Sequence, residues 1–308
     1  PFGRLVSGAA RSTDPFPGNV SLGAASFAIE VAPRGFTRRT GDFCSFPPLR
    51  LNFDRSALQG TQFEGQNHLK LVTHCRAQAS FASVGVREYL AYRLYNLVTP
   101  FSFRVRPAQI TYHDNEGRFA DLTRFGFLIE DAGEMARRNG RTELEVAPDS
   151  VDAAQLDPAS AANLALFQFM IGNLDWSYTS GPPGDDCCHN GKLIAREGET
   201  SSIVPVPYDF DFSGFVGASY ATPPPSAPIS NVRTRYYWGL CRHNDQLPAA
   251  ADLFRARREA MGALIASETR LNEASRTSSQ NYIADFFAIL DDPERFDRLI
   301  VRRCRGAS

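Results

Sequence analysis

Lysine is almost absent from this sequence. Of its 33 lysine and arginine residues only Lys70 and Lys192 are lysines, no extended basic run occurs, and the formal net charge is −1. Proteins that bind nucleic acids or anionic membrane surfaces need clustered cations for these partners. We therefore expect no nucleic-acid partner.

Long apolar stretches are also missing. A helix that crosses a bilayer needs about 20 predominantly apolar residues, so we expect no transmembrane segment. The sequence begins at Pro1 rather than at methionine, which fits the removal of a signal peptide and equally fits a trimmed chain. An even number of cysteines permits three disulfides in an oxidising compartment: Cys44, Cys75, Cys187, Cys188, Cys241 and Cys304. We expect a secreted, periplasmic or cell-surface protein.

The cysteines allow more than one arrangement. Cys44 and Cys75 bracket a predicted hairpin and are expected to join there, and we expect at least two disulfides in all. Adjacent Cys187 and Cys188 are expected to bind different partners, which leaves the remaining pairing open. Buried, reduced cysteines are a further alternative.

Zinc binding is a competing interpretation of the same residues. Cysteine and histidine come together in Cys187-Cys188-His189 and in Cys241-Arg242-His243, and both side chains are common zinc ligands. Neither cluster has the C-x-x-C spacing of a common zinc site, so we favour disulfides.

The order of predicted elements indicates an α+β fold with two lobes. Residues 1–40 are rich in Gly, Ser and Pro and predict an irregular N-terminal extension with short strands. Residues 41–131 predict a small β-rich lobe with one helix, and residues 132–308 a larger, mainly helical lobe. No internal repeat is present.

Periodicity places the individual elements. Alternating apolar residues predict strands over 49–53, 67–73, 101–113, 124–130, 192–195 and 203–208. The first two of these strands should form a hairpin that leads to Lys70. Apolar residues at helical spacing predict helices over 86–98, 249–267, 279–291 and 293–304. Another helix should begin at Asp157-Pro158, which supplies an N-cap and a proline at the first helical position, and end at Gly172.

Lys70 has a distinctive setting. It lies within the strand-like run NHLKLVT, and its compact ammonium meets phosphate as a point charge that a planar guanidinium does not reproduce. Glu88, on the helix that follows, would hold Lys70 in place. The alternative for Glu88 is a solvated helix charge.

Acidic residues gather in the segment VPYDFDFSG. Asp209 and Asp211 are two residues apart, so on an extended segment both carboxylates point to the same side and reach one ion. The flanking residues are apolar, and a buried carboxylate needs a partner. We predict that this segment binds Mg²⁺ or Mn²⁺.

A third acid, Asp175 in IGNLDW, follows the predicted helix. A phosphoryl-transfer site needs a cation, acidic or amide metal ligands and a carboxylate base, and Asp175 is the candidate base. An isolated loop aspartate is more often a turn former or a cap, so this interpretation depends on the neighbouring motifs.

The order of these motifs resembles the atypical protein-kinase-like family, which includes the spore-coat kinase CotH, the toxin kinase HipA and phosphoinositide lipid kinases. It is also similar to uncharacterised bacterial proteins in which a TxFEGQxxLKLVTHC segment is followed by REYLAYRLYN. The resemblance runs from about Leu49 to Asp211 and extends less clearly to Cys304. It implies a two-lobed protein-kinase-like fold that uses ATP with Mg²⁺ or Mn²⁺.

The resemblance also implies roles for individual residues. Lys70 would contact the α- and β-phosphates with Glu88 as its pair, Asp175 would be the catalytic base, and Asp209 would be the principal metal ligand. FLIEDAG resembles a kinase hinge, whose backbone groups would receive adenine at Ile129, Glu130 and Asp131.

Two departures from the family pattern bear on activity. Ser180 stands where kinase catalytic loops place a metal-binding asparagine; Asn190 would supply that amide if SGPPGDDCCH is an insertion. Gly60 and Gly65 stand alone where a glycine-rich loop is usual. We predict a secreted kinase that phosphorylates a protein or glycan hydroxyl. A small-molecule phosphotransferase and a disulfide-braced pseudokinase that acts as a binding module remain the alternatives.

Overall fold

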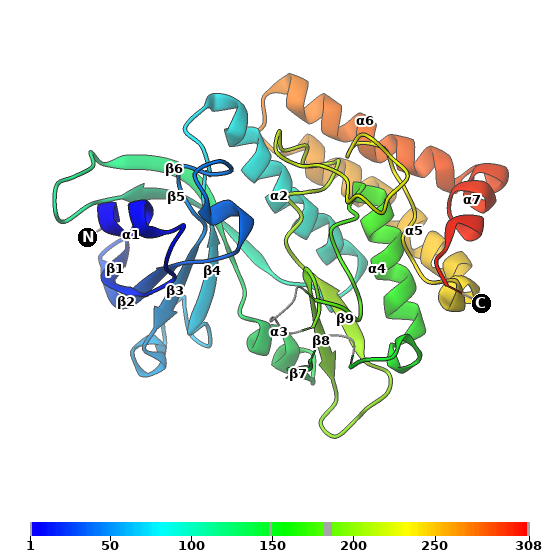
Figure 1. The fold of residues 1–308 in the computed structure, drawn as a ribbon, viewed down its shortest axis with the longest axis horizontal. Coiled ribbons are helices and arrows are strands. Elements are labelled where there is room, and N and C mark those ends of the chain that lie inside the picture. Colours follow the sequence, from blue (N-terminus) through cyan, green and yellow to red (C-terminus); the bar gives the residue numbers. More distant parts are fainter. Residues whose placement is uncertain (1, 148–149, 182–186, 307–308) are drawn as a thin grey trace. The chain divides into compact units, whose positions relative to one another are not determined.

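The computed structural model describes residues 2–147, 150–181 and 187–306, and the fold is α+β, as predicted (Figure 1). The chain divides into two compact units. The first unit comprises Pro1–Tyr89 and Arg104–Glu134, and the second comprises Leu90–Phe103 and Met135–Ser308. In the described part of the chain, none of the helices combines the length and hydropathy that crossing a bilayer would require.

An antiparallel sheet dominates the first unit. Its strand order is β1-β2-β3-β4-β6-β5, and the strands are β1 (Phe16–Leu22), β2 (Ala25–Pro33), β3 (Leu49–Phe53), β4 (His68–Val72), β5 (Val105–Tyr112) and β6 (Leu122–Ile129). The pairing of β3 with β4 confirms the predicted hairpin before Lys70. Helix α1 (Phe2–Gly8) precedes the sheet, and helix α2 (Ala79–Val98) begins in this unit.

Residues 1–40 differ from the irregular extension that we expect from the sequence. They contain α1, β1 and β2, and β2 pairs with β3, so that Val31 lies opposite Leu51. Phe27, Ile29 and Val31 alternate with small or polar residues, which is the period of a strand. In β1, Pro17 and Gly18 interrupt the alternation of apolar and polar residues, so the strand is harder to recognise from the sequence.

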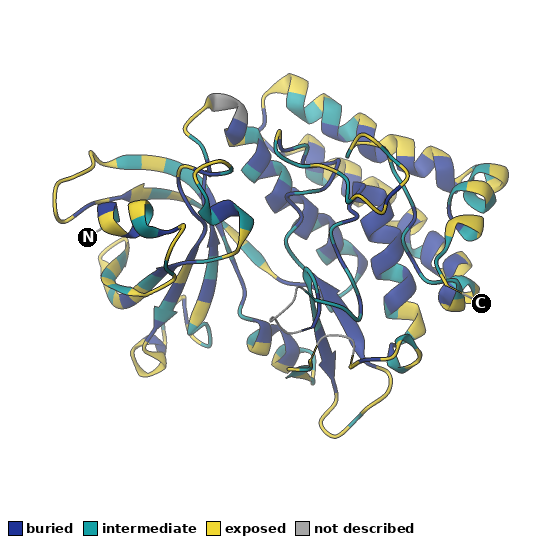
Figure 2. Ribbon diagram, viewed as in Figure 1, coloured by how far each residue is buried: buried dark blue, intermediate teal, exposed yellow. Residues whose placement is uncertain are grey.

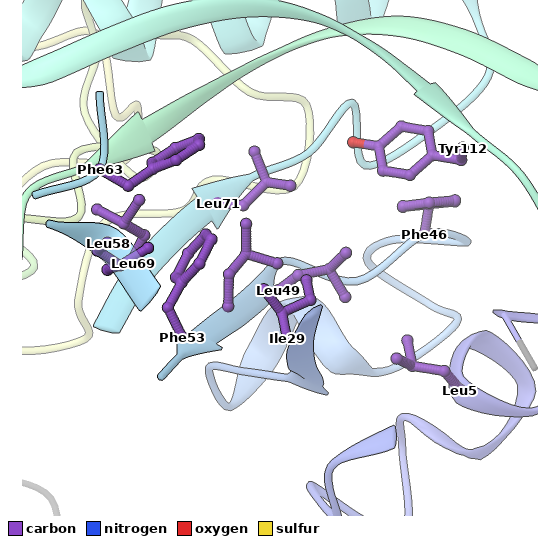
Figure 3. Close-up of a cluster of buried hydrophobic side chains, with 11 residues drawn as sticks. Leu5, Ile29, Phe46, Leu49, Phe53, Leu58, Phe63, Leu69, Leu71 and Tyr112 are labelled. Atoms are coloured by element: carbon purple, nitrogen blue, oxygen red, sulfur yellow. The ribbon is translucent and has the colours of Figure 1, made fainter. Parts of the chain in front are cut away.

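The two faces of the sheet have different roles. One face packs an apolar core around Leu49, Leu51, Leu69 and Leu71 (Figure 3). Because successive strand residues point to opposite faces, Lys70 lies on the other face. Helix α2 covers that face, where the Tyr89 ring centroid lies 5.9 Å from that of Phe127. Lys70 and α2 therefore share one side of the sheet.

The second unit combines a small sheet with several helices (Figure 1). Strands β7 (Thr142–Leu144), β8 (Gly191–Ala195) and β9 (Val204–Pro207) pair in that order. The helices are α4 (Pro158–Ile171), α5 (Leu247–Ala266), α6 (Glu273–Leu290) and α7 (Pro293–Leu299), and α3 (Ala132–Arg138) leads into the unit. Helix α4 is almost wholly buried (Figure 2) and packs against α5 and β9.

The predicted ends of α4 are confirmed. The Asp157 side chain accepts a hydrogen bond from the Ser160 N–H at 2.8 Å, and Pro158 follows the cap. Gly172 ends the helix with φ of 64°, a conformation that glycine adopts without steric cost. The chain after Gly172 is thereby turned away from the helix axis.

All six cysteines lie in described residues and form three disulfides, so the expectation of at least two is confirmed. Cys44 pairs with Cys75 as predicted, and Cys241 pairs with Cys304. The expectation that adjacent cysteines bind different partners is wrong, because Cys187 is joined to Cys188. Disulfide sulfurs are not thiolates, so the zinc interpretation of these cysteines is wrong as well.

Candidate functional site

Asp175 lies in a tight turn after α4. It is half-exposed between the buried residues Leu174 and Trp176. The Asp175 N–H donates to Asn173 Oδ1 at 3.0 Å, and Trp176 Nε1 donates to the Asn173 carbonyl at 3.0 Å. Asn173 and the buried neighbours therefore anchor the turn and leave the Asp175 carboxylate partly accessible.

Asn190 binds Asp175 through two contacts. Its Nδ2 donates to the Asp175 carbonyl at 2.7 Å and to Asp175 Oδ2 at 2.9 Å. The backbone of Asn190 has φ of 51°, a value that is uncommon for residues other than glycine. Asn190 is the amide that we expect near the base if SGPPGDDCCH is an insertion; residues 182–186 of that segment lie outside the described residues.

His189 contacts the other carboxylate oxygen. Its Nε2 lies 2.7 Å from Asp175 Oδ1. Backbone bonds fix the segment that carries it, because Ser177 N donates to the His189 carbonyl at 3.0 Å and His189 N donates to the Ser180 carbonyl at 2.8 Å. Sequence reasoning considered His189 only as a zinc ligand, and no local pattern links it to Asp175.

Strand register brings Asp209 to the same region. Gly191 lies opposite Pro207 in the β8–β9 pair, and Tyr208 N donates to the Asn190 carbonyl at 3.0 Å. Asp209 follows directly. Its φ is 62°, and its N–H donates to the Tyr92 hydroxyl at 2.8 Å. The hairpin thus places Asn190 and Asp209 on neighbouring chain segments.

Asp209 and Asp211 do not lie on the extended segment that we expect from the sequence. Strand β9 ends at Pro207, and the left-handed backbone at Asp209 breaks the alternation that would direct both carboxylates to one side. Asp211 is buried and accepts a hydrogen bond from the Tyr220 hydroxyl at 2.8 Å. The role of Asp211 as a metal ligand remains a prediction. Asp209, in contrast to buried Asp211, is half-exposed.

Tyr92 is a further residue that the sequence did not single out. It is buried on α2, and its ring centroid lies 4.6 Å from that of Phe210. The hydroxyl accepts from the Asp209 N–H, as described above, while the ring packs beside the next residue. Tyr92 therefore supports the backbone conformation at Asp209 from a different element.

Replacing Tyr92 with Phe should isolate this hydrogen bond. The Phe variant keeps the ring contact but removes the acceptor of the part-buried Asp209 N–H, and a typical intramolecular hydrogen bond contributes about 0.5–1.5 kcal/mol. We expect urea unfolding to show this loss. A Tyr95→Phe variant is the control, because Tyr95 is equally buried beside Phe167 but lies outside the site. A Tyr92→Phe free energy of unfolding equal to that of the wild type would contradict the role.

The side chains described around Asp175 offer few metal ligands. Within the described residues, no three His, Cys, Asp or Glu side chains gather closely enough to hold an ion by themselves. Mg²⁺ is usually bound by one or two carboxylates together with substrate phosphates and water. Because Asn190 Nδ2 donates to Asp175, its Oδ1 is the amide atom suited to a cation, and Asp209 supplies a carboxylate. Both oxygens are of the kind that Mg²⁺ accepts, and binding of Mg²⁺ or Mn²⁺ by this pair stays a prediction.

A pocket in the second unit adjoins Asp175. It is mostly apolar and is lined by Gly172, Leu174, Asp175, Phe212, Thr222, Pro223, Pro224, Ile229 and Val232. The proline-containing loop that follows Asp211 forms one wall. The pocket volume of about 10 Å³ is enough for about one water molecule, so the pocket does not hold a substrate by itself.

The first unit holds the remaining predicted residues. Lys70 lies opposite Arg50 on β3 and Ile129 on β6. On the α2 face, the buried Glu88 carboxylate forms an ion pair with Arg38, whose Nη1 lies 3.0 Å from Glu88 Oε2. Arg38 was not anticipated, since it is 50 residues from Glu88. The predicted pairing of Glu88 with Lys70 remains a prediction.

Two backbone N–H groups of the predicted hinge donate hydrogen bonds within the protein. Glu130 N donates to the Arg104 carbonyl at 3.0 Å, and Glu130 Oε2 accepts from Arg104 N at 2.9 Å. Asp131 N donates to Gln66 Oε1 at 3.1 Å. A ligand that accepts from the Asp131 N–H would have to displace the Gln66 side chain. Adenine binding at Ile129, Glu130 and Asp131 stays a prediction.

Comparison of the sequence with protein-family models and with curated proteins finds no match in either case. Evidence for function therefore comes from the residues and their geometry.

Proposed function

We propose that this protein is an atypical kinase that transfers the γ-phosphate of ATP to a hydroxyl group. The observation that carries the proposal is the bond network in the second unit. Asn190 holds both the carbonyl and the carboxylate of Asp175, and the β8–β9 register sets Asp209 next to Asn190. Two carboxylates and an amide therefore lie on adjoining loops, which supports assigning them as the base and the metal ligands that phosphoryl transfer requires in addition to a cation.

Asp175 acts as the base in this proposal. The acceptor oxygen forms a bond to the γ-phosphorus while the bond from that phosphorus to the β–γ bridging oxygen breaks, so ADP leaves. The proton of the acceptor hydroxyl passes to the Asp175 carboxylate. Aligning the hydroxyl is as important as taking its proton, since catalysis of this transfer is mostly positioning and charge stabilisation.

Asn190 and Asp209 are the proposed metal ligands, with Asp211 beside them. A bound Mg²⁺ or Mn²⁺ would neutralise charge on the phosphate oxygens. The Tyr92 hydroxyl holds the backbone of Asp209, and Asp175 holds the Asn190 amide. In the first unit, Lys70 is proposed to bind phosphate, with Glu88 on the same side of the sheet.

The exposed side of Asp175 is the proposed acceptor position. The Asp175 side chain is 34% exposed, so a hydroxyl carried by a larger molecule can reach the carboxylate, and the acceptor is a protein, a glycan or a small molecule. The three disulfides fit an oxidising compartment, so we propose a secreted, periplasmic or cell-surface location. We also propose that the α+β fold is kinase-like and resembles that of the CotH and HipA kinases.

Replacing Asp209 with Ala tests metal-dependent nucleotide binding. ATP with Mn²⁺ at a hundredfold excess over Kd should stabilise the wild type by about 2.7 kcal/mol, which raises Tm by several degrees. The Asp209→Ala variant should lose the metal-dependent part of this shift. Exposed Asp252, in the same unit, provides the control Asp252→Ala, which should shift as the wild type does. An unchanged wild-type Tm with ATP and either ion would contradict the proposal.

A pseudokinase is the second candidate. The observation in its favour is the engagement of the Glu130 and Asp131 N–H groups by Arg104 and Gln66, because adenine recognition at this strand would compete with these contacts. Such a protein would keep the fold as a binding module without turnover. Nucleotide binding without phosphate release or transfer would support it.

A further inference from the structure

We propose that His189 is a positioning residue that fixes the carboxylate of Asp175 for phosphoryl transfer. The inference rests on the proposed function of the site, but it assigns a role to a residue outside the predicted set. Its basis is the 2.7 Å contact between His189 Nε2 and Asp175 Oδ1.

The two oxygens of Asp175 have separate partners. Oδ1 is held by His189, and Oδ2 by Asn190 at 2.9 Å. Because an ionised carboxylate only accepts hydrogen bonds, the proposed role of Asp175 requires that Nε2 of His189 carry the proton in this contact. With a donor on each oxygen, the plane of the carboxylate is set from both sides, and rotation about its bond to the β-carbon would break both contacts.

The imidazole is itself held in place. The His189 N–H donates to the Ser180 carbonyl, and the His189 carbonyl accepts from the Ser177 N–H. The preceding residue, Cys188, forms a disulfide with Cys187. Side-chain exposures of 37% for His189 and 34% for Asp175 leave the pair open to solvent and substrate on one side. A general base must be held in one orientation and must also be accessible to the acceptor hydroxyl, and this pair satisfies both requirements.

Orientation has a large effect on rate. A displacement of about 1 Å in a reacting group can cost on the order of 10²-fold. The His189→Ala variant removes the donor to Oδ1 and leaves the bond to Asn190, so the carboxylate can turn. The His189→Gln variant restores an N–H donor on a side chain of similar reach.

Steady-state transfer of labelled phosphate from ATP with Mn²⁺ tests the role. We expect kcat of His189→Ala to fall by about 10- to 100-fold, with KM for ATP nearly unchanged and with recovery of most of the rate in His189→Gln. The exposed pair His113 and Asp121, also 2.7 Å apart, provides the control: His113→Ala should match the wild type. A His189→Ala kcat equal to that of the wild type would overturn the inference, as would equal losses in the Ala and Gln variants.

A measurement on the protein without nucleotide separates this inference from the proposed function. Long-range ¹H–¹⁵N NMR should show His189 protonated at Nε2 in the wild type, and the Asp175→Ala variant should alter that signal. If the wild type shows this signature but no transfer activity, the kinase proposal is refuted. The positioning role of His189 in transfer then falls with it, although the contact itself is established. A wild type with activity but with Nε2 unprotonated would overturn the His189 inference alone.

Discussion

Asp175→Asn should bind ATP as the wild type does and transfer phosphate about 10²–10⁴ times more slowly, the usual cost of removing a general base. The amide keeps the shape of the carboxylate but loses its charge and most of its basicity. The surrounding bonds can adapt: the amide oxygen accepts from Asn190, and its NH₂ group donates to Nε2 of His189 in the other tautomer. The fold should therefore survive the change.

Single-turnover transfer and calorimetry together test this expectation. Lys70→Met is the matched comparison, because it removes the proposed phosphate contact and should weaken nucleotide binding, whereas Asp175→Asn should not. Equal transfer rates in Asp175→Asn and the wild type would show that Asp175 is not the base. Loss of ATP binding in Asp175→Asn would show that the site has been disturbed more broadly.

Removal of the Cys241–Cys304 disulfide should produce the largest change in stability. The two cysteines are 63 residues apart, and a crosslink over a loop of this length is worth about 4 kcal/mol in the chain-entropy model. The disulfide ties the end of the described chain to the segment before α5, where Cys241 N also donates to the Arg305 carbonyl at 3.0 Å. We expect Cys241→Ala/Cys304→Ala to lose stability by about this amount in urea unfolding.

The adjacent cysteines supply the control. Cys187 and Cys188 close no loop of chain, so Cys187→Ala/Cys188→Ala should lose little of the entropic stabilisation that long loops gain. The ranking of the two double variants is the test. A Cys241→Ala/Cys304→Ala variant as stable as the wild type would contradict the entropic argument.

Local chemistry in the sequence accounts for much of the fold. Strict alternation around Leu69 and Leu71 fixed the face of Lys70, since a one-residue slip would have moved both leucines out of the core. Helix α4 was predictable at both ends because its cap, its proline and its terminal glycine are each local signals. The α+β class followed from the order of such elements.

Parts of the site could not be predicted because they depend on contacts between distant residues. Arg38 meets Glu88 across 50 residues, and His189 meets Asp175 across 14. Neither contact leaves a periodic pattern. The left-handed conformation of Asp209 was also invisible, because the sequence after Pro207 continues to read as an extended strand; its hydrogen bond to Tyr92 shows what supports that conformation.

Transfer of labelled γ-phosphate by the wild-type protein is the measurement that tests the central claim most directly. The oxidised protein is incubated with labelled ATP and Mg²⁺ or Mn²⁺, together with protein, glycan and small-molecule hydroxyl acceptors, and the products are separated. The account predicts label in at least one acceptor or in the protein itself, with loss of that label in Asp175→Asn and Asp209→Ala. Label that remains entirely in ATP under every condition, although the protein binds the nucleotide, would contradict the account and leave a pseudokinase.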